Sequence, residues 1–150
     1  MTCGHCANFH KDVYPELKKD FIDKGLVKIE FRHFPLDLAA FNASKIAQCN
    51  NDGNSNILNI LYSGQKKWAR GKTPEEATGY LKKFLESESV NLDFDKCLSD
   101  KAIEDYILND RIEGVKKFEV NATPTIIIND KKFDKALNYK NLKKYLEKLI

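Results

Sequence analysis

Apolar side chains recur at intervals of three and four residues through the beginning of the chain, which is the period of an α-helix. These positions are Ala7, Phe9, Val13, Leu17, Phe21 and Ile22. The spacing predicts a helix from Cys3 to about Lys24, with Gly25 ending it. Pro15 lies inside this stretch. Because proline lacks a backbone N–H and crowds the preceding turn, we expect a kink or a restart near Tyr14.

The next segment, LVKIEFRHF, alternates between apolar and charged residues. Val27, Ile29 and Phe31 fall on one side, and Lys28, Glu30 and Arg32 fall on the other. A period of two is typical of a strand with one buried face. We therefore predict a strand at residues 26–34, closed by Pro35.

Residues 37–118 contain no strand pattern and divide into several helices. We predict these helices at about 38–51, 55–68, from Thr73 onward, and 99–118 with a weak point at Gly114. The third begins with TPEE, in which Thr73 caps the helix, Pro74 occupies the first turn and Glu76 reaches back to the cap. The whole block is predicted to be an inserted helical subdomain.

The pattern changes again at TPTIIINDKKFD, a β-branched run followed by a turn at Asn129-Asp130 and a short strand around Phe133. A last helix is predicted at about 139–150, with an apolar face made by Leu142, Tyr145, Leu146 and Leu149. The elements predict an α/β fold with a large helical insertion. One domain then consists of residues 1–36 and 119–150, and residues 37–118 are the insertion.

Composition narrows the class of protein. The 150 residues are 42% hydrophobic and carry a net charge of +3. Lysines alternate with acidic and apolar residues, as on a solvated helix face, so we do not expect nucleic-acid binding. No apolar segment approaches the roughly 20 residues of a membrane helix, and no basic and apolar leader precedes Cys3.

The reactive chemistry is expected at the start of the first helix, in the sequence CGHC. Unpaired N–H groups and the positive end of the helix dipole stabilise a thiolate there, so the pKa of Cys3 should fall. A fall from about 8.5 to about 5.5 would favour the thiolate by roughly 4 kcal/mol. Cys3 would attack the substrate and Cys6, one turn further in, would resolve the mixed disulfide.

Two residues lie between the cysteines. His5 can add a positive charge or a hydrogen bond to the Cys3 thiolate. A site whose reduced form is stabilised in this way tends to oxidise its partners. Gly4 keeps the first turn open for an approaching polypeptide chain.

The order of these motifs resembles a known family. CGHC at the head of a kinked helix, FRHFPLD before a helical insertion, then TPT, IIIND, a hairpin and a closing helix are similar to DsbA-like thiol:disulfide oxidoreductases of the thioredoxin fold. The resemblance covers essentially the whole chain from Cys3 onward. The dipeptide Gly4-His5 is the one associated with protein disulfide isomerases, whereas DsbA itself has proline and histidine there.

The resemblance implies further site residues. Thr123-Pro124 would be a cis peptide bond opposite the CxxC motif, with the Thr123 backbone pairing with a substrate strand. Some DsbA-like relatives also have a structural disulfide in the insertion, and the same pair here would be Cys49 with Cys97. Two free buried thiols are the alternative at those positions.

The resembled fold has a central strand that leads directly into the CxxC motif, between the strands at 26–34 and 125–130. Only Met1 and Thr2 stand there in this sequence. A gap would leave two rows of backbone donors and acceptors unpaired. We therefore expect that the sequence lacks its natural N-terminal segment, or that another chain fills the place. An acidic group that accepts the Cys6 proton would then lie on that strand.

Two other classes of function stay open. Cys3, Cys6 and His10 have a spacing that could supply three zinc ligands, although no fourth ligand is nearby in the sequence. A redox-inert thioredoxin-like binding module is the second alternative. Phe9 could line an apolar groove beside Cys3, whereas the tyrosines are expected to pack in the core or at its rim.

The resemblance implies an enzyme that oxidises cysteine pairs in unfolded, exported proteins through a Cys3-Cys6 disulfide. Isomerase and reductase activity use the same atoms and stay open. No metal or organic cofactor is expected, because the dithiol is itself the redox group. A periplasmic or other exported oxidising compartment, and a membrane redox partner that accepts the electrons, are implied only by the resemblance.

Overall fold

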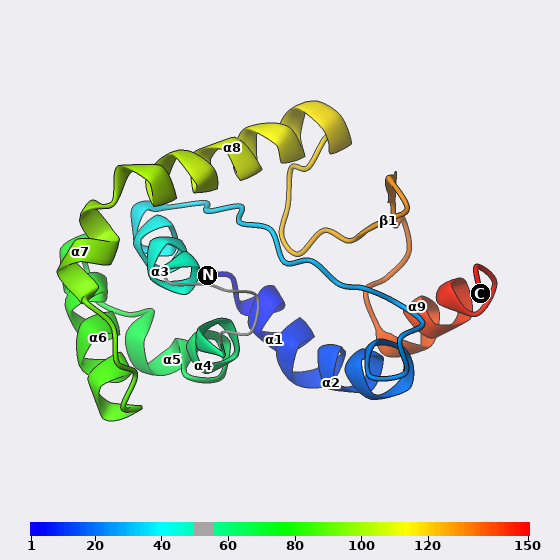
Figure 1. Cartoon of the computed structure of the whole chain (residues 1–150), viewed down its shortest axis with the longest axis horizontal. Helices are drawn as coiled ribbons and strands as arrows, with labels where there is room; N and C mark the ends of the chain where they lie inside the picture. The colour runs from blue at the N-terminus through cyan, green and yellow to red at the C-terminus, as the bar shows by residue number, and fades with distance from the viewer. Residues whose placement is uncertain (50–55) are drawn as a thin grey trace.

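The computed structural model of the chain describes residues 1–49 and 56–150 (Figure 1). Its helices are α1 (Gly4–Asp12), α2 (Tyr14–Leu17), the π-helical turn η1 (Lys18–Ile22), α3 (Leu38–Gln48), α4 (Ile57–Ser63), α5 (Gln65–Trp68), α6 (Pro74–Ser87), α7 (Phe94–Ser99), α8 (Lys101–Phe118) and α9 (Tyr139–Leu146). Strands β1 (Ile127–Ile128) and β2 (Lys131–Lys132) form an antiparallel hairpin. Most of the described chain is therefore helical.

The first helical segment is interrupted where the sequence predicted it. α1 ends at Asp12, and Pro15 lies in the first turn of α2, where its missing N–H costs no hydrogen bond. The segment ends before Gly25, whose φ of 69° is in the left-handed region. Of the two predicted alternatives, the restart with Pro15 in the first turn is confirmed.

Residues 26–34 are extended but form no strand, so this prediction is wrong. A strand is defined by hydrogen bonds to a neighbour, and no described strand lies alongside this segment. From Lys28 to Arg32 the backbone makes no hydrogen bond to the backbone of the described residues. The alternating sequence favours an extended conformation, whereas a strand forms only if a neighbouring strand hydrogen-bonds to it. That a further strand occupies this place stays a prediction.

The helical block differs from the prediction at two glycines, and α7 was not predicted. The helix predicted at 55–68 is two helices, α4 and α5, that meet at Gly64. A Cβ atom at Gly64 would lie only 2.0 Å from Cζ of Phe84, so the close approach of α6 requires glycine. The break predicted near Gly114 is absent, because α8 runs continuously from Lys101 to Phe118. Residues 50–55 of the predicted helices lie outside the described residues.

The start of α6 is capped nearly as predicted. The Thr73 hydroxyl accepts a hydrogen bond from the backbone N–H of Glu76 at 3.2 Å. The Glu76 carboxylate accepts from the N–H of Lys72 at 2.7 Å, one residue before the cap. The capping motif is therefore present, with its return bond shifted by one residue.

The hairpin and the last helix agree with the sequence. Asn129 and Asp130 form the turn, with φ values of 48° and 62°. Both residues tolerate this left-handed region, which a two-residue hairpin turn requires. α9 packs its buried face, with Leu142 and Leu146, against the first helical segment.

Buried side chains form two hydrophobic clusters. The first lies in α3 to α7 and includes Ile46, Leu61 and Trp68. The second joins α1, α2 and η1 to Phe133 and α9. Figure 1 shows the two groups of elements at opposite ends of the molecule, with α8 running along one side. This arrangement is the one expected for a thioredoxin-like domain with a helical insertion at residues 37–118. The exact boundaries of the insertion stay a prediction.

None of the helices in the described part of the chain is both long enough and apolar enough to pass through a membrane.

Candidate active site

Cys3 is the N-cap residue of α1, with φ −69° and ψ 119°. The carbonyl of Cys3 accepts the first helical hydrogen bond, from the N–H of Ala7 at 3.2 Å. The next N–H groups of α1 therefore lack helical partners and point toward the side of Cys3. Cys6 lies one turn further along and is buried, and both thiols are free in this structure. The expected difference in exposure between the two cysteines is confirmed.

The environment of Cys3 favours its thiolate. Burial of the thiol opposes ionisation, yet hydrogen bonding from the side chain of Thr123, from Cys6 and from the backbone of His5 outweighs it and lowers the pKa of Cys3. In the thiol form, Cys3 Sγ donates to the Thr123 carbonyl oxygen at 3.3 Å. The Thr123 hydroxyl is buried without a partner among the described residues, so it is available to donate when the sulfur is ionised.

Cys6 has the opposite preference. Burial raises the pKa of its thiol to about 11, with the neighbouring Cys3 as the next contribution. Near neutral pH, Cys6 is thus a thiol and Cys3 has the larger thiolate fraction. This asymmetry suits an attacking sulfur at Cys3 and a resolving sulfur at Cys6.

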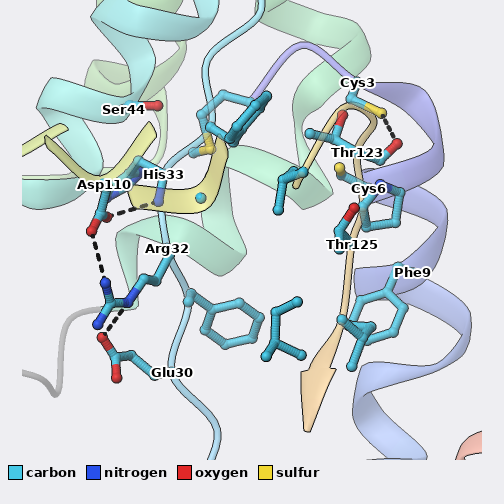
Figure 2. A pocket seen from close by; sticks show the side chains of 18 of the residues that line it. Cys3, Cys6, Phe9, Glu30, Arg32, His33, Ser44, Asp110, Thr123 and Thr125 are labelled. Carbon is cyan, nitrogen blue, oxygen red and sulfur yellow. Dashed lines mark hydrogen bonds and ion pairs between the residues drawn. The ribbon is translucent and has the colours of Figure 1, made fainter. Parts of the chain in front are cut away.

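The peptide bond between Thr123 and Pro124 is cis, as the resemblance implied. Figure 2 shows the Thr123 segment beside Cys3 and Cys6 on one side of a cavity, with Arg32 and His33 on the other side. The cavity has a volume of about 470 Å³. The two extended segments, 28–34 and 123–127, face each other across it.

A charged network forms the far wall of the cavity. Asp110 of α8 is buried, and its carboxylate accepts from the backbone N–H of His33 at 3.0 Å. Arg32 forms ion pairs with Asp110 at 3.6 Å and Glu113 at 2.6 Å. The network holds the extended segment against α8, in a place where none of the strands of the described residues pairs with it.

Gln65 of α5 is a buried residue that the sequence analysis missed. Its side-chain amide donates to the backbone carbonyls of Met1 at 2.6 Å and Cys3 at 2.9 Å. This contact fixes the start of α1 from the helical insertion. Nothing in the sequence around Gln65 marks it, because its partners lie more than sixty residues away.

Gln65→Met should lower the free energy of unfolding by about 1 to 3 kcal/mol. Methionine keeps the volume but leaves the Met1 carbonyl buried without this donor. Urea denaturation followed by circular dichroism measures the change. Lys66→Met, an exposed neighbour on the same helix, is the matched control and should change stability by less than about 0.5 kcal/mol. Equal stability of the two variants would contradict the assigned role.

His10 lies one turn after Cys6 and packs in an aromatic group. Its ring stacks on Tyr62 of α4 with centroids 4.2 Å apart, and it contacts Phe31 and Tyr14 at 4.9 and 5.3 Å. Burial lowers its pKa to about 4, although a hydrogen bond with Asn59 opposes the shift. No group of three metal-ligating side chains occurs among residues 1–49 and 56–150, so His10 does not complete a zinc site with the cysteines there.

Stability should fall as the pH drops from 6.5 toward 4. A histidine in the unfolded chain has its ordinary pKa of 6.5, whereas burial lowers the pKa of His10 to about 4 in the folded protein. The unfolded chain therefore binds more protons between these two values. Allowing for its partial exposure, we expect this residue to account for about 2 kcal/mol of the loss. Urea denaturation of the wild type and of His10→Phe at pH 7 and pH 4.5 measures it, and an identical pH dependence in both proteins would contradict the assignment.

The other expected site residues lie as follows. Gly4 and His5 are exposed in the first turn of α1, with open space where a Gly4 Cβ would lie. Phe9 is buried and lines the cavity below Cys6, as Figure 2 shows. A direct role of the His5 side chain stays a prediction, since the interaction of His5 with Cys3 is made by its backbone.

Cys49 and Cys97 form a disulfide between the end of α3 and α7, with a Cα–Cα distance of 5.6 Å. Both cysteines are buried in the first hydrophobic cluster. This is the pairing that the resemblance implied, and it gives the chain a second, separate cysteine pair with no place in the cavity.

A family model described as thioredoxin matches residues 1–148, the range that contains the CxxC helix, the cis proline and the hairpin. The chain belongs to the thioredoxin family. Within that family it is 30% identical to disulfide bond formation protein D of Bacillus subtilis, over 97% of this chain and 67% of that protein. A Rickettsia felis relative, whose name proposes it as a protein-disulfide oxidoreductase, is 33% identical over 85% of this chain and 46% of its own length.

Solved structures extend the comparison of this thioredoxin-family chain. The crystal structure of alpha-DsbA1 from Wolbachia pipientis superimposes with a TM-score of 0.85 and 28% identity, covering 99% of this chain and 80% of that one. A protein-disulfide isomerase from Novosphingobium aromaticivorans has a TM-score of 0.84 at 17% identity, over 99% of this chain and 87% of that one, and supports the fold alone. The predicted DsbA-like resemblance is confirmed. The chain spans about half the length of the Rickettsia bellii and Rickettsia felis relatives.

Proposed function

We propose that this protein oxidises pairs of cysteines in unfolded polypeptides by thiol-disulfide exchange at Cys3 and Cys6. The observation that carries the proposal is the asymmetry of the two thiols. The pKa of Cys3 is lowered at the N-terminus of α1, whereas burial raises that of Cys6 to about 11. The names of the relatives support the same reaction class.

The reaction begins with the oxidised site. A substrate thiolate attacks Cys3 Sγ, the Cys3–Cys6 bond breaks, and Cys6 Sγ leaves with the electron pair. A second substrate thiolate then attacks the substrate sulfur of the mixed disulfide, and Cys3 leaves as a thiolate. The substrate loses two electrons and the protein gains them. Stabilisation of the Cys3 thiolate favours this direction.

The surroundings of Cys3 provide for a polypeptide substrate. The Thr123 backbone lies 3.3 Å from Cys3 Sγ at the cavity, where it can pair with an extended substrate strand beside the attacked sulfur. The space beside Gly4, where a Cβ atom would lie, is also open. Action on exported proteins in the periplasm, and return of the electrons to a membrane redox partner, complete the proposal by analogy with DsbA-like relatives.

Oxidative refolding of reduced, unfolded ribonuclease A tests the proposal. The Cys3–Cys6 disulfide form should restore ribonuclease activity stoichiometrically, and its equilibrium with glutathione should favour the dithiol form of the protein. An equilibrium that strongly favours the disulfide form would contradict an oxidase and indicate a reductase.

Isomerase activity is a second candidate, favoured by the Gly4-His5 dipeptide. Isomerisation begins from the reduced protein, whose Cys3 thiolate attacks a wrong disulfide in the substrate. Recovery of activity from scrambled ribonuclease, with the reduced protein and no added oxidant, distinguishes it. The oxidase proposal expects little recovery in that assay.

A further inference from the structure

Tyr62 reaches the cysteine pair from the helical insertion. It belongs to α4 and lines the same cavity as Cys3 and Cys6. Its ring stacks on His10, one turn after Cys6 on α1, with an interplanar angle of 22°. Stacking on His10 therefore fixes the orientation of the Tyr62 ring in the cavity.

The contacts around His10 hold this arrangement from three sides. The His10 ring contacts Phe31 of the extended segment at 4.9 Å, Tyr14 at 5.3 Å and Tyr62 of α4 at 4.2 Å, measured between ring centroids. These contacts restrain α1 and α4 relative to each other. Tyr62 is thereby held at the wall of the cavity that Cys6 also lines, close enough for the two side chains to influence each other.

In this position Tyr62 is suited to act as a hydrogen-bond donor. Burial, followed by the neighbouring Cys6 and Cys3, raises the pKa of Tyr62, so the phenol keeps its proton. A neutral phenol has one O–H to donate, and a thiolate accepts it better than a thiol does.

Cys6 needs such a donor in the reaction. Its sulfur leaves as a thiolate in a buried place that disfavours the charge. Within the described residues, the main influences on the Cys6 pKa are burial, Cys3, Thr123 and the N-terminal ammonium of Met1, and no carboxylate is among them. A hydrogen bond from a fixed phenol stabilises the developing charge without a proton transfer.

We infer that Tyr62 is a further catalytic residue of the proposed exchange reaction, donating a hydrogen bond to Cys6 Sγ as the Cys3–Cys6 bond breaks. The inference depends on the proposed function for its role in turnover. The substrate sulfur bonds to Cys3, Cys6 takes the electron pair of the broken bond, and the Tyr62 proton stays on the phenol oxygen throughout.

Tyr62→Phe tests the inference, because phenylalanine keeps the ring on His10 and removes only the hydroxyl. Tyr14→Phe is the matched control, since Tyr14 also contacts His10. The rate constant for attack of a reduced dithiol peptide on the disulfide form should fall about threefold to tenfold in Tyr62→Phe. It should change less than twofold in Tyr14→Phe, and both variants should keep the urea midpoint of the wild type.

A second measurement does not depend on activity. In a Cys3→Ser background, the thiolate absorbance of Cys6 is titrated with and without Tyr62→Phe, and the variant should ionise at higher pH. The inference is overturned by an unchanged titration, or by an equal rate loss in both tyrosine variants, which would assign the effect to packing. Absence of exchange in the wild type, together with a shifted titration, would reject the proposed function while keeping the contact between Tyr62 and Cys6.

Discussion

Cys3→Ser is expected to reduce catalysed oxidation of a dithiol substrate by a thousandfold or more, to the uncatalysed rate. Serine can still cap α1, but its hydroxyl stays protonated near neutral pH and forms no disulfide. Far-ultraviolet circular dichroism should be unchanged, because the Cys3 side chain makes no capping hydrogen bond. Initial rates of oxidation of a dithiol peptide measure the effect.

Cys6→Ser distinguishes the attacking role of Cys3 from the resolving role of Cys6. This variant keeps the Cys3 thiolate, so it should react with a substrate disulfide and remain as a mixed disulfide. Gel electrophoresis without reducing agent detects the adduct, which dithiothreitol should release. Normal turnover by Cys3→Ser, or adducts formed at Cys6 in that variant, would contradict the division of roles between the two sulfurs.

The second large effect concerns stability. Replacing both Cys49 and Cys97 with alanine is expected to lower the free energy of unfolding by about 4 kcal/mol. The disulfide joins residues separated by 48 positions, and without it the unfolded chain gains the entropy of that loop. Equilibrium unfolding in urea, compared with the wild type under non-reducing conditions, measures the difference.

Cys49→Ala alone is the control for this effect, because it removes the cross-link and leaves the Cys97 thiol in the core. Its stability should resemble that of the double variant, to within about 1 kcal/mol for the one additional buried sulfur that is lost. The rate of alkylation of Cys3 should change less than twofold in both variants, since the pair lies outside the cavity. A loss below about 1 kcal/mol in the double variant would show that the cross-link contributes little.

Features that depend on neighbouring residues could be predicted from the sequence. The break at Pro15, the left-handed Gly25, the Thr73 cap and the Asn129-Asp130 turn all depend on contacts within a few positions. The place of Cys3 at the start of α1 belongs to the same class. Local backbone sterics and short hydrogen bonds determine these features, so the sequence pattern is sufficient for them.

Features made by distant segments could not be predicted from the pattern. Gln65 and Tyr62 meet the CxxC turn only after α4 and α5 pack on α1. The cis bond before Pro124 and the pairing of Cys49 with Cys97 were expected through the resemblance, not through periodicity. The strand predicted at 26–34 is absent for a related reason. Alternation determines which side chains lie on each face of a segment, but a strand also needs a neighbouring strand to which it can hydrogen-bond.

The first turn of α1 lies where the two hydrophobic clusters meet. Met1 packs in the cluster of the insertion, whereas Phe9 belongs to the cluster with α9. Cys6, between them in the sequence, is buried and lines the cavity. A thiol reagent should therefore label Cys6 slowly in native buffer, and the labelling rate reports how often local opening of the start of α1 exposes this sulfur, without any denaturant.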